Sequence, residues 1–590
     1  MNVRRKPESW AWMLWLPLWA WTATSWSGLL QKAESRDLFI WSWDFISSRL
    51  LQPGGLLSLT GSFLTQFLHI PVLGALLLTA LYALLARMVR RLYFKEGRNS
   101  MFSLFPSAFL ACAAMATGYM VYRLKLAAFL FVPPLGLTVA VLAPTLATHF
   151  RNRPAFILIW TATAYSLAGF YGLLGTLLVI IKSDSHRLAD TAAALAAVAA
   201  VPLVWAQFYT GTRTDNAFLA MLPLFSPEKR YFACALPYLL AILSLLFMPL
   251  AARLPQFRCN AAILTAIAAL TIFCPSIGKR QFRTELKMSA AVDEQDWEKV
   301  VTLGDRSLAI AARDVAHGRR RICEPTRLMV LYRDLALLEL GREGTEAFNY
   351  RRTGIKPETA VPVSMAVQAA RQMYFHFGLP AYSYRWCFET SAQSGLSYEN
   401  LVYMSASCIL GGNEKGADRY LTRLEHTLFY RKWALQQRSA GGDGYGFARA
   451  MLCTEDWLDN DYSQLEAFLS SYFTQYETSC SSPEFYRTAL LWSAQTRLTE
   501  RFFNAYDNYV SNCGPDGLDS HWQQALQLFA GITQGADISR IPLDKEQKQL
   551  FISFRKFMRD NPEPSEKELQ KWFGNTFYYY FQSGQMPPMY

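Results

Sequence analysis

No short motif typical of a soluble enzyme is present in the 590 residues. The sequence contains no GxxxxGK(S/T) phosphate-binding loop, no HExxH pair and no GxSxG elbow. The ten cysteines form no CxxC pair, and no histidine stands at zinc-ligand spacing from them, so the sequence predicts no metal site. Charged residues make up only 18% of the chain and aromatic residues 14%, which excludes a disordered protein.

Acidic residues are scarce in the first half of the chain. Residues 1–283 hold 25 Lys and Arg against 9 Asp and Glu, whereas residues 284–590 hold 33 against 37. The basic residues of the first half stand between long apolar runs rather than in one patch. This arrangement argues against a nucleic-acid partner and against a single soluble domain.

The apolar runs of the first half predict membrane-spanning helices, each of which needs about 20 mostly apolar residues. The first run follows Arg4, Arg5 and Lys6 and is expected to be a retained signal anchor rather than a cleaved signal peptide. The runs cover residues 10–30, 61–85, 101–121, 126–148, 155–181, 191–209, 231–251 and 261–274.

The positive-inside rule orients these runs and places the N-terminus in the cytoplasm. Residues 155–181 form either one long span or two short segments, because Gly169, Gly172 and Gly175 fall in the middle, where a break is cheap. A single crossing leaves Lys182 and Arg253 outside, whereas two crossings keep them in the cytoplasm, so we favour two. The sequence therefore predicts nine crossings within residues 1–281 of a bacterial inner-membrane protein, with a periplasmic C-terminal half.

Residues 282–590 read as amphipathic helices separated by short breaks, which predicts an all-α protein: a polytopic transmembrane domain followed by a soluble helical domain. Gly341, Gly378 and Gly412 recur 37 and 34 residues apart, close to the period of a tetratricopeptide repeat. A glycine permits the tight turn of a helical hairpin. The alternative is a helical bundle without repeats.

Two cysteines of this half could pair. Cys480 and Cys513 bracket an expected helical hairpin over residues 483–512, which would bring its two ends together. A disulfide between them is our hypothesis, and it requires an oxidising compartment.

Candidate chemistry lies after the first apolar run. Asp37 and Asp44 stand among aromatic residues of an expected interfacial helix, where carboxylates are costly unless they are solvated or functional. Arg123, Lys125 and Arg213 lie in loops that could face them. Together these groups could hold a lipid pyrophosphate while a carboxylate removes a proton from an acceptor hydroxyl. The alternatives are that the aspartates only cap or solvate the helix, that Arg123 and Lys125 are only interface anchors at the headgroups, and that Arg213 pairs with Asp215 in its loop.

The order of features at residues 10–95 resembles the start of the membrane-embedded C-type glycosyltransferase superfamily. These features are an apolar span, an acidic loop, an interfacial helix, Pro53-Gly54-Gly55-Leu56 and a second span. The resemblance implies a first-loop carboxylate as catalytic base and a lipid-phosphate sugar donor. Asp37 is followed by Leu38 and Asp44 by Phe45, so the usual adjacent acidic pair is absent and the base stays open between them.

The whole chain also resembles a family of multi-pass proteins of Bacteroides-type bacteria that has a repeat-like C-terminal half and no assigned activity. Leu340-Gly341-Arg342 and the stretch from Leu428 to Ala434 carry this likeness. Two functions follow as hypotheses. One is a glycosyltransferase-like enzyme at the outer face of the membrane. The other is a membrane-anchored scaffold whose repeats bind a protein or peptide partner.

Overall fold

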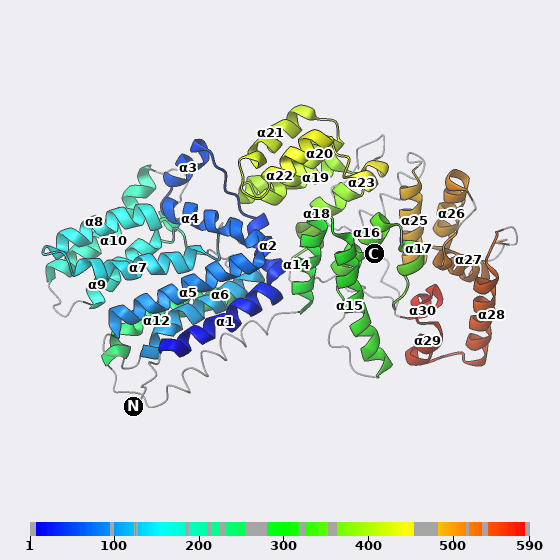
Figure 1. Ribbon diagram of the computed structural model, residues 1–590, viewed down its shortest axis with the longest axis horizontal. Helices are drawn as coiled ribbons and strands as arrows, with labels where there is room; N and C mark the ends of the chain where they lie inside the picture. Colours follow the sequence, from blue (N-terminus) through cyan, green and yellow to red (C-terminus); the bar gives the residue numbers. More distant parts are fainter. Residues whose placement is uncertain are drawn as a thin grey trace. The chain divides into compact units, whose positions relative to one another are not determined.

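The computed structural model is all-α, and the residues it describes contain no strand (Figure 1). It describes residues 8–94, 100–122, 124, 128–182, 188–208, 214–223, 232–253, 280–317, 325–351, 363–452, 482–514, 518–533, 538 and 541–583, without the side chains of residues 8–14, 214–215, 232–234 and 315. The predicted all-α class is confirmed.

The chain packs as two units. The first comprises Met1–Lys279, Thr390–Val402 and Arg419–Arg438, and the second comprises Arg280–Glu389, Tyr403–Asp418 and Ser439–Tyr590. The sequence places a single boundary between residues 281 and 282. The first unit thus includes two stretches that sequence analysis assigns to the C-terminal domain.

The N-terminal part of the first unit consists of helices that form two groups. Helices α1, α5, α6 and α12 lie side by side, and α7 to α10 pack on one another (Figure 1). The helices are α1 Glu8–Ser25, α2 Ser27–Ser35, α3 Trp43–Leu50, α4 Gly55–Thr65, η1 Gln66–His69, α5 Pro71–Tyr93, η2 Ser100–Leu104, α6 Phe105–Gly118, α7 Val132–Ala147, α8 Arg153–Ala168, α9 Phe170–Lys182, α10 Leu188–Phe208, α11 Thr214–Ala217 and α12 Phe232–Arg253.

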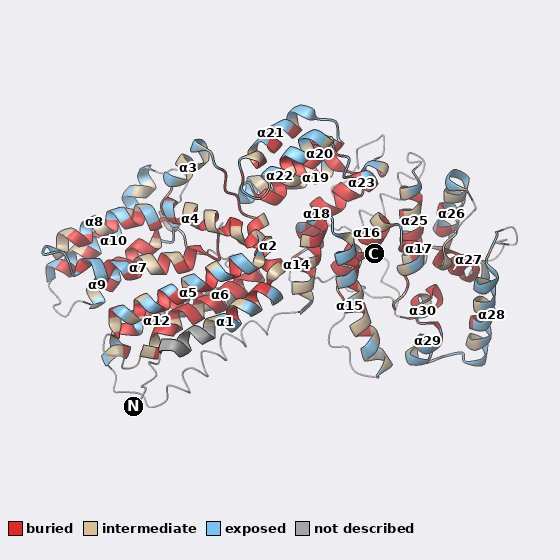
Figure 2. Cartoon of the chain, viewed as in Figure 1, coloured by how far each residue is buried: buried red, intermediate tan, exposed pale blue. Residues whose placement is uncertain are grey.

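Four helical stretches among the described residues are long and apolar enough to cross a membrane: Pro71–Tyr93, Ser100–Gly118, Leu188–Phe208 and Ala235–Arg253. Helices α7 and α9 are apolar but shorter. Much of α10 and α12 is exposed or only partly buried (Figure 2). Leu195 of α10, for example, is 68% exposed. Apolar surface of this extent is typical of helices that contact lipid, so the chain associates with a membrane. The number of crossings and the topology stay predictions.

The helices differ from the first two predicted apolar runs and agree with the favoured division of a third. The first run is split at Trp26 into α1 and α2, and the second begins a full helix only at Pro71, whose fixed φ suits the first helical position. Residues 155–181 form two helical segments, as favoured from the sequence: they break at Gly169 into α8 and α9, which pack against each other. The last run, 261–274, lies outside the described residues.

Gly169 explains the break between α8 and α9. Its φ is +60°, and a Cβ there would lie 2.7 Å from the carbonyl oxygen of Ala220. The next residue, Phe170, donates its N–H to that same oxygen at 3.0 Å. Only glycine fits this close approach of two backbones, so the chain reverses here.

The later helices are α14 Arg280–Asp293, α15 Trp297–Ala316, α16 Arg327–Leu340, α17 Glu343–Glu346, α18 Met365–His376, α19 Pro380–Ser394, α20 Tyr398–Leu410, α21 Glu414–Glu425, α22 Arg431–Ala440, α23 Gly446–Ala450, α25 Pro483–Thr496, α26 Thr499–Cys513, α27 Ser520–Ile532, α28 Lys545–Asp560, α29 Glu566–Phe573 and α30 Phe577–Gln582. Within the second unit, α14 packs on α15, α15 on α16 and α25 on α26. The hairpin expected over residues 483–512 is confirmed.

The three recurring glycines each follow a helix and have a positive φ, +70° at Gly341, +75° at Gly378 and +72° at Gly412. These are the helix-ending turns that their spacing predicts. The tetratricopeptide resemblance itself stays a prediction. Cys513 is exposed at the end of α26, whereas Cys480 lies outside the described residues, so the disulfide is also untested.

Candidate functional site

The candidate site is built on the loop that joins α2 to α3. The backbone N–H of Asp37 donates to the Glu34 carbonyl at 2.9 Å as α2 ends. The next three residues, Leu38, Phe39 and Ile40, are all buried. Burial of these apolar side chains draws the loop into the protein and carries the preceding carboxylate with it.

Asp37 is a desolvated carboxylate with only one bonded oxygen. The residue is 3% exposed. Its Oδ1 accepts from the Leu38 N–H at 2.8 Å and from Ser62 Oγ at 3.1 Å. Its Oδ2 is buried and has no hydrogen-bond partner among the described residues. Burial raises the pKa of Asp37, and the Arg49 guanidinium acts in the opposite direction.

The turn at Pro53-Gly54-Gly55-Leu56 brings α4 over this carboxylate. Gly54 has a φ of +76°, and its N–H donates to the Ser166 carbonyl at 2.9 Å. A Cβ there would lie 2.3 Å from Met221 Cγ, so the site requires glycine. The helix that follows carries Ser62, which bonds to Asp37, and Ser58.

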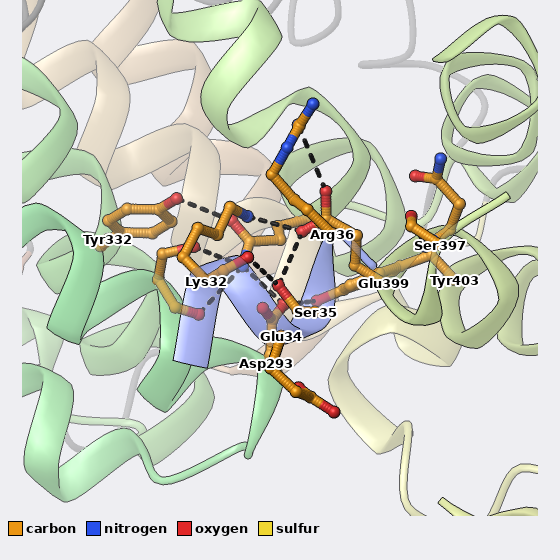
Figure 3. Close-up of polar contacts among 12 residues, drawn as sticks. Lys32, Glu34, Ser35, Arg36, Asp293, Tyr332, Ser397, Glu399 and Tyr403 are labelled. Atoms are coloured by element: carbon orange, nitrogen blue, oxygen red, sulfur yellow. Dashed lines mark hydrogen bonds and ion pairs between the residues drawn. The ribbon is translucent and has the colours of Figure 1, made fainter. Parts of the chain in front are cut away.

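A second buried carboxylate, Glu399, is held by three residues of α2 and its end (Figure 3). Lys32 Nζ lies 2.6 Å from Glu399 Oε2, Ser35 Oγ donates to the same oxygen at 3.2 Å, and Arg36 Nη1 lies 3.6 Å from Oε1. The cations of Lys32 and Arg36 also lie over the Tyr122 ring, 5.2 and 5.8 Å from its centroid. These contacts compensate a charge that would otherwise be costly to bury.

Hydrogen bonds hold the stretches Thr390–Val402 and Arg419–Arg438 against the α2–α3 loop inside the first unit. The Tyr398 N–H donates to the Asp37 carbonyl at 3.0 Å. The Tyr398 hydroxyl accepts from the Phe39 N–H at 3.1 Å and donates to the Phe39 carbonyl at 3.0 Å. Further along the loop, the Trp41 N–H donates to the His426 carbonyl at 2.9 Å. Residues far apart in the sequence therefore form one polar site.

These elements enclose a cavity of about 200 Å³. It is smaller than the roughly 300–1,000 Å³ of pockets for drug-sized ligands, so it suits a polar headgroup. Its lining is rich in charged groups, amides and hydroxyls, with some apolar side chains. The residues are Ala33, Arg36, Asp37, Arg49, Gln52, Ser58, Val121, Leu124, Ala128, Phe129, Met221, Thr390, Ser394, Gly395, Leu396, Ser397, Glu399 and Asn400.

Two of these lining residues, Arg49 and Asn400, each carry a polar group that makes no hydrogen bond with a described residue. The Arg49 guanidinium lies 5.3 Å from the Phe45 ring centroid and makes no hydrogen bond or ion pair with a described residue. Asn400 is 1% exposed, and its Nδ2 donates to Ser391 Oγ at 3.0 Å, while its Oδ1 is buried without a partner in the described structure. Together with Asp37 Oδ2, the cavity therefore presents one cation and two acceptors for a ligand.

Another carboxylate of α2, Glu34, belongs to a separate aromatic cluster. It accepts from the Tyr430 hydroxyl at 3.0 Å and lies 3.8 Å from His69 Nδ1. Tyr430 stacks on Tyr398 with their ring centroids 4.7 Å apart. Burial raises the pKa of Glu34, and His69 acts in the opposite direction. This cluster supports the wall of the site from behind Tyr398.

The structure separates the two aspartates that the sequence leaves as alternatives. Asp44 is exposed in the first turn of α3, where Ser42 caps the helix by accepting from the Phe45 N–H. Asp37 alone of the two lines the cavity. The three predicted phosphate-binding residues, Arg123, Lys125 and Arg213, lie outside the described residues.

Sequence analysis did not predict the cations Lys32, Arg36 and Arg49 near the cavity, nor the lining residues that come from Thr390–Val402. Lys32 and Arg36 directly follow the first apolar run, and their position next to the acidic loop was an available signal. Arg49 lies in the expected interfacial helix. Nothing in the sequence marks Glu399 or Asn400, because an acid and an amide in the first turn of an amphipathic helix read as ordinary solvent-facing residues.

Within the described part of the chain, no group of three or more His, Cys, Asp or Glu residues could hold a metal ion. The fold and site define an all-α protein that associates with a membrane and has a cavity lined by charged and polar residues in its first unit. A model for a family of unknown function, DUF6057, matches residues 6–584, so the chain belongs to this family. No curated protein and no solved structure matches the chain.

Proposed function

We propose that the chain is a membrane-embedded transferase of the C-type glycosyltransferase kind that uses a lipid-phosphate sugar donor, with Asp37 as the catalytic base. The observation that carries the proposal is the state of Asp37, which is buried, lines the cavity and keeps Oδ2 without a partner among described residues. Asp44, exposed on α3, is not part of this site.

The chemistry assigned to Asp37 is proton removal. Its carboxylate takes the proton of an acceptor hydroxyl while the hydroxyl oxygen bonds to the anomeric carbon of the donor sugar. The bond from that carbon to the phosphate oxygen breaks, and the lipid phosphate leaves with the electron pair. Burial raises the pKa of Asp37, which makes the carboxylate a stronger base than an exposed one.

Cations of the cavity would bind the phosphate in this scheme. Arg49 has no ion-pair partner among described residues, and Arg36 lies at the longer distance of 3.6 Å from Glu399. A guanidinium can bind two phosphate oxygens at once and offset the charge that develops on the leaving group. The cavity has room for a headgroup only, so the lipid chain would lie outside it, along the apolar helices.

The scaffold hypothesis needs no polar cavity in the membrane-associated unit. A cavity with buried, unpartnered oxygen atoms favours the transferase, since such atoms are costly unless a ligand or water pairs with them. Placement of this site at the outer face of a bacterial inner membrane, with the second unit in the periplasm, is part of the proposal.

The test compares two single substitutions in cells that express only the variant protein. Asp37→Asn should lower incorporation of radiolabelled sugar into envelope material by roughly 100-fold or more and make lipid-linked sugar accumulate, because general base catalysis contributes about 10²–10⁴-fold. The matched control, Asp44→Asn, should stay within about twofold of the natural protein. Equal incorporation by both variants at equal protein levels would overturn the proposal and favour the scaffold.

A further inference from the structure

The first unit contains a second polar feature that proton removal does not use: the Asn400 amide in the cavity wall. One end of this amide is bonded to Ser391, and the other end has no partner among described residues although it is fully buried. Leaving a buried acceptor unpaired is unfavourable, and native proteins rarely do so. In a cavity, such an atom marks a place where a ligand donates a hydrogen bond.

The surroundings of Asn400 identify the kind of ligand. The same stretch of chain brings Thr390, Ser394 and Ser397 to the cavity, and these side chains carry hydroxyl groups. Arg49 adds a cation without an ion-pair partner in the described structure. Amide and hydroxyl groups pair well with the hydroxyls of a polyol, whichever way the amide is turned, because a hydroxyl both donates and accepts.

We infer that Asn400 binds a sugar hydroxyl of a hexose phosphate headgroup whose phosphate is bound by Arg49. This inference rests on the proposed function, in which a sugar phosphate enters the cavity. It adds the residue that distinguishes a sugar phosphate from phosphate alone. Asn400 is a binding residue rather than a catalytic one. Asn400 belongs to the stretch Thr390–Val402, and the hydrogen bonds of Tyr398 hold this stretch against the Asp37 loop.

The experiment measures ligand binding to the full-length protein in detergent, with mannose 1-phosphate, glucose 1-phosphate and inorganic phosphate as probes in titration calorimetry. Asn400→Ala should weaken binding of at least one hexose phosphate about tenfold and leave inorganic phosphate unchanged, because it removes one hydrogen bond to the sugar. Arg49→Gln should weaken binding of both kinds of probe.

Two controls keep the result interpretable. Asn400→Leu keeps the branched shape and the number of heavy atoms of the side chain and should show the same selective loss even if the alanine variant unfolds. Asn512→Ala, a change at an exposed asparagine of the second unit, should bind all probes as the natural protein does. Thermal unfolding without ligand reports whether each variant is folded.

Three results would each overturn the inference. The first is an equal loss of affinity for sugar phosphate and inorganic phosphate, and the second is no loss of affinity in a folded Asn400 variant. The third is that the natural protein binds no hexose phosphate. Failure of the proposed function is distinguishable. It would appear as normal sugar incorporation by Asp37→Asn, while the selective binding defect of Asn400→Ala persisted.

Discussion

Two buried aspartates, one in each unit, show what separates a candidate site from a structural carboxylate. Asp37 in the first unit and Asp334 in the second are 3% and 8% exposed. Burial raises the pKa of both, that of Asp334 to about 6. Asp334 accepts from Gln495 Nε2 at 2.7 Å and lies in α16 among residues of a hydrophobic core of the second unit.

The difference lies in what each carboxylate faces. Asp37 lines a cavity and keeps one oxygen without a partner among described residues, whereas Asp334 is bonded within the packed helices of its own unit. A raised pKa therefore follows from desolvation in both places and does not by itself identify a functional residue. Of these two aspartates, only Asp37 has both a raised pKa and access to a ligand.

The largest effect on stability is expected from the buried ion pair beside this cavity. Lys32→Met removes the cation 2.6 Å from Glu399 and leaves the 3.2 Å hydrogen bond from Ser35 Oγ and the 3.6 Å contact to Arg36, so it should destabilise the first unit by about 3–5 kcal/mol, since it weakens the compensation of a buried charge. Chemical denaturation of the purified protein measures the change. The double variant Lys32→Met/Glu399→Gln should recover a large part of the loss, and no recovery would contradict the pairing.

The two aspartates themselves should respond to pH in the same direction. A carboxyl whose pKa is raised in the folded state costs stability as pH rises from its unfolded pKa to its folded pKa, and the cost persists above that. Asp334→Asn should therefore raise thermal stability at pH 8, by on the order of 3 kcal/mol at most for a folded pKa of about 6, and have no such effect at pH 3.

Asp37→Asn should also be stabilising at pH 8 and lose that advantage in acid, because burial raises the pKa of this carboxyl as well. Only the Asp37 change should abolish sugar incorporation. Melting temperatures at both pH values, together with the labelling assay, separate stability from function. A pH-independent stability difference in both variants would show that neither carboxyl is desolvated.

A smaller effect is expected at two glycines with a positive φ. Gly54→Ala brings a Cβ to 2.3 Å from Met221 Cγ, whereas Gly412 has no atom within 4 Å of the same position. Gly412→Ala should cost about 1–2 kcal/mol through backbone strain alone, and Gly54→Ala should cost more. Denaturation midpoints check this order, and equal costs would mean that the methionine side chain moves away freely.

The smallest effect belongs to an exposed ion pair. Arg385 and Glu389, one helical turn apart in α19, are 52% and 49% exposed. Arg385→Ala should change the free energy of unfolding by about 0.5 kcal/mol or less, because solvent screens such pairs. A loss comparable to that of Lys32→Met would mean that burial is not what makes the Lys32–Glu399 pair important.

Much of the helical architecture could be predicted from local pattern. The run at 191–209 corresponds to α10 Leu188–Phe208, and the run at 231–251 to α12 Phe232–Arg253, because a long apolar stretch suits a helix that contacts lipid. A break among Gly169, Gly172 and Gly175 was also predictable, and the structure places it at Gly169. Prediction was less good at residues 61–85, where a short helix and a 3-10 turn precede α5.

Only the part of the site around Asp37 could be predicted from the sequence. Asp37 stands out because an acidic residue next to a span is costly, yet the sequence could not separate it from Asp44, seven positions later. Their difference arises from packing, because the side chains of Leu38 and Phe39 are buried while α3 stays at the surface.

The sequence by itself determined the helical class, the apolar helices and the acidic loop, because these follow from local periodicity and composition. Only the tertiary structure decided that Glu399 and Asn400, more than 360 positions from Asp37, belong to the same cavity. Contacts of that separation depend on the packing of complete helices, and no local pattern encodes which helix end meets which loop.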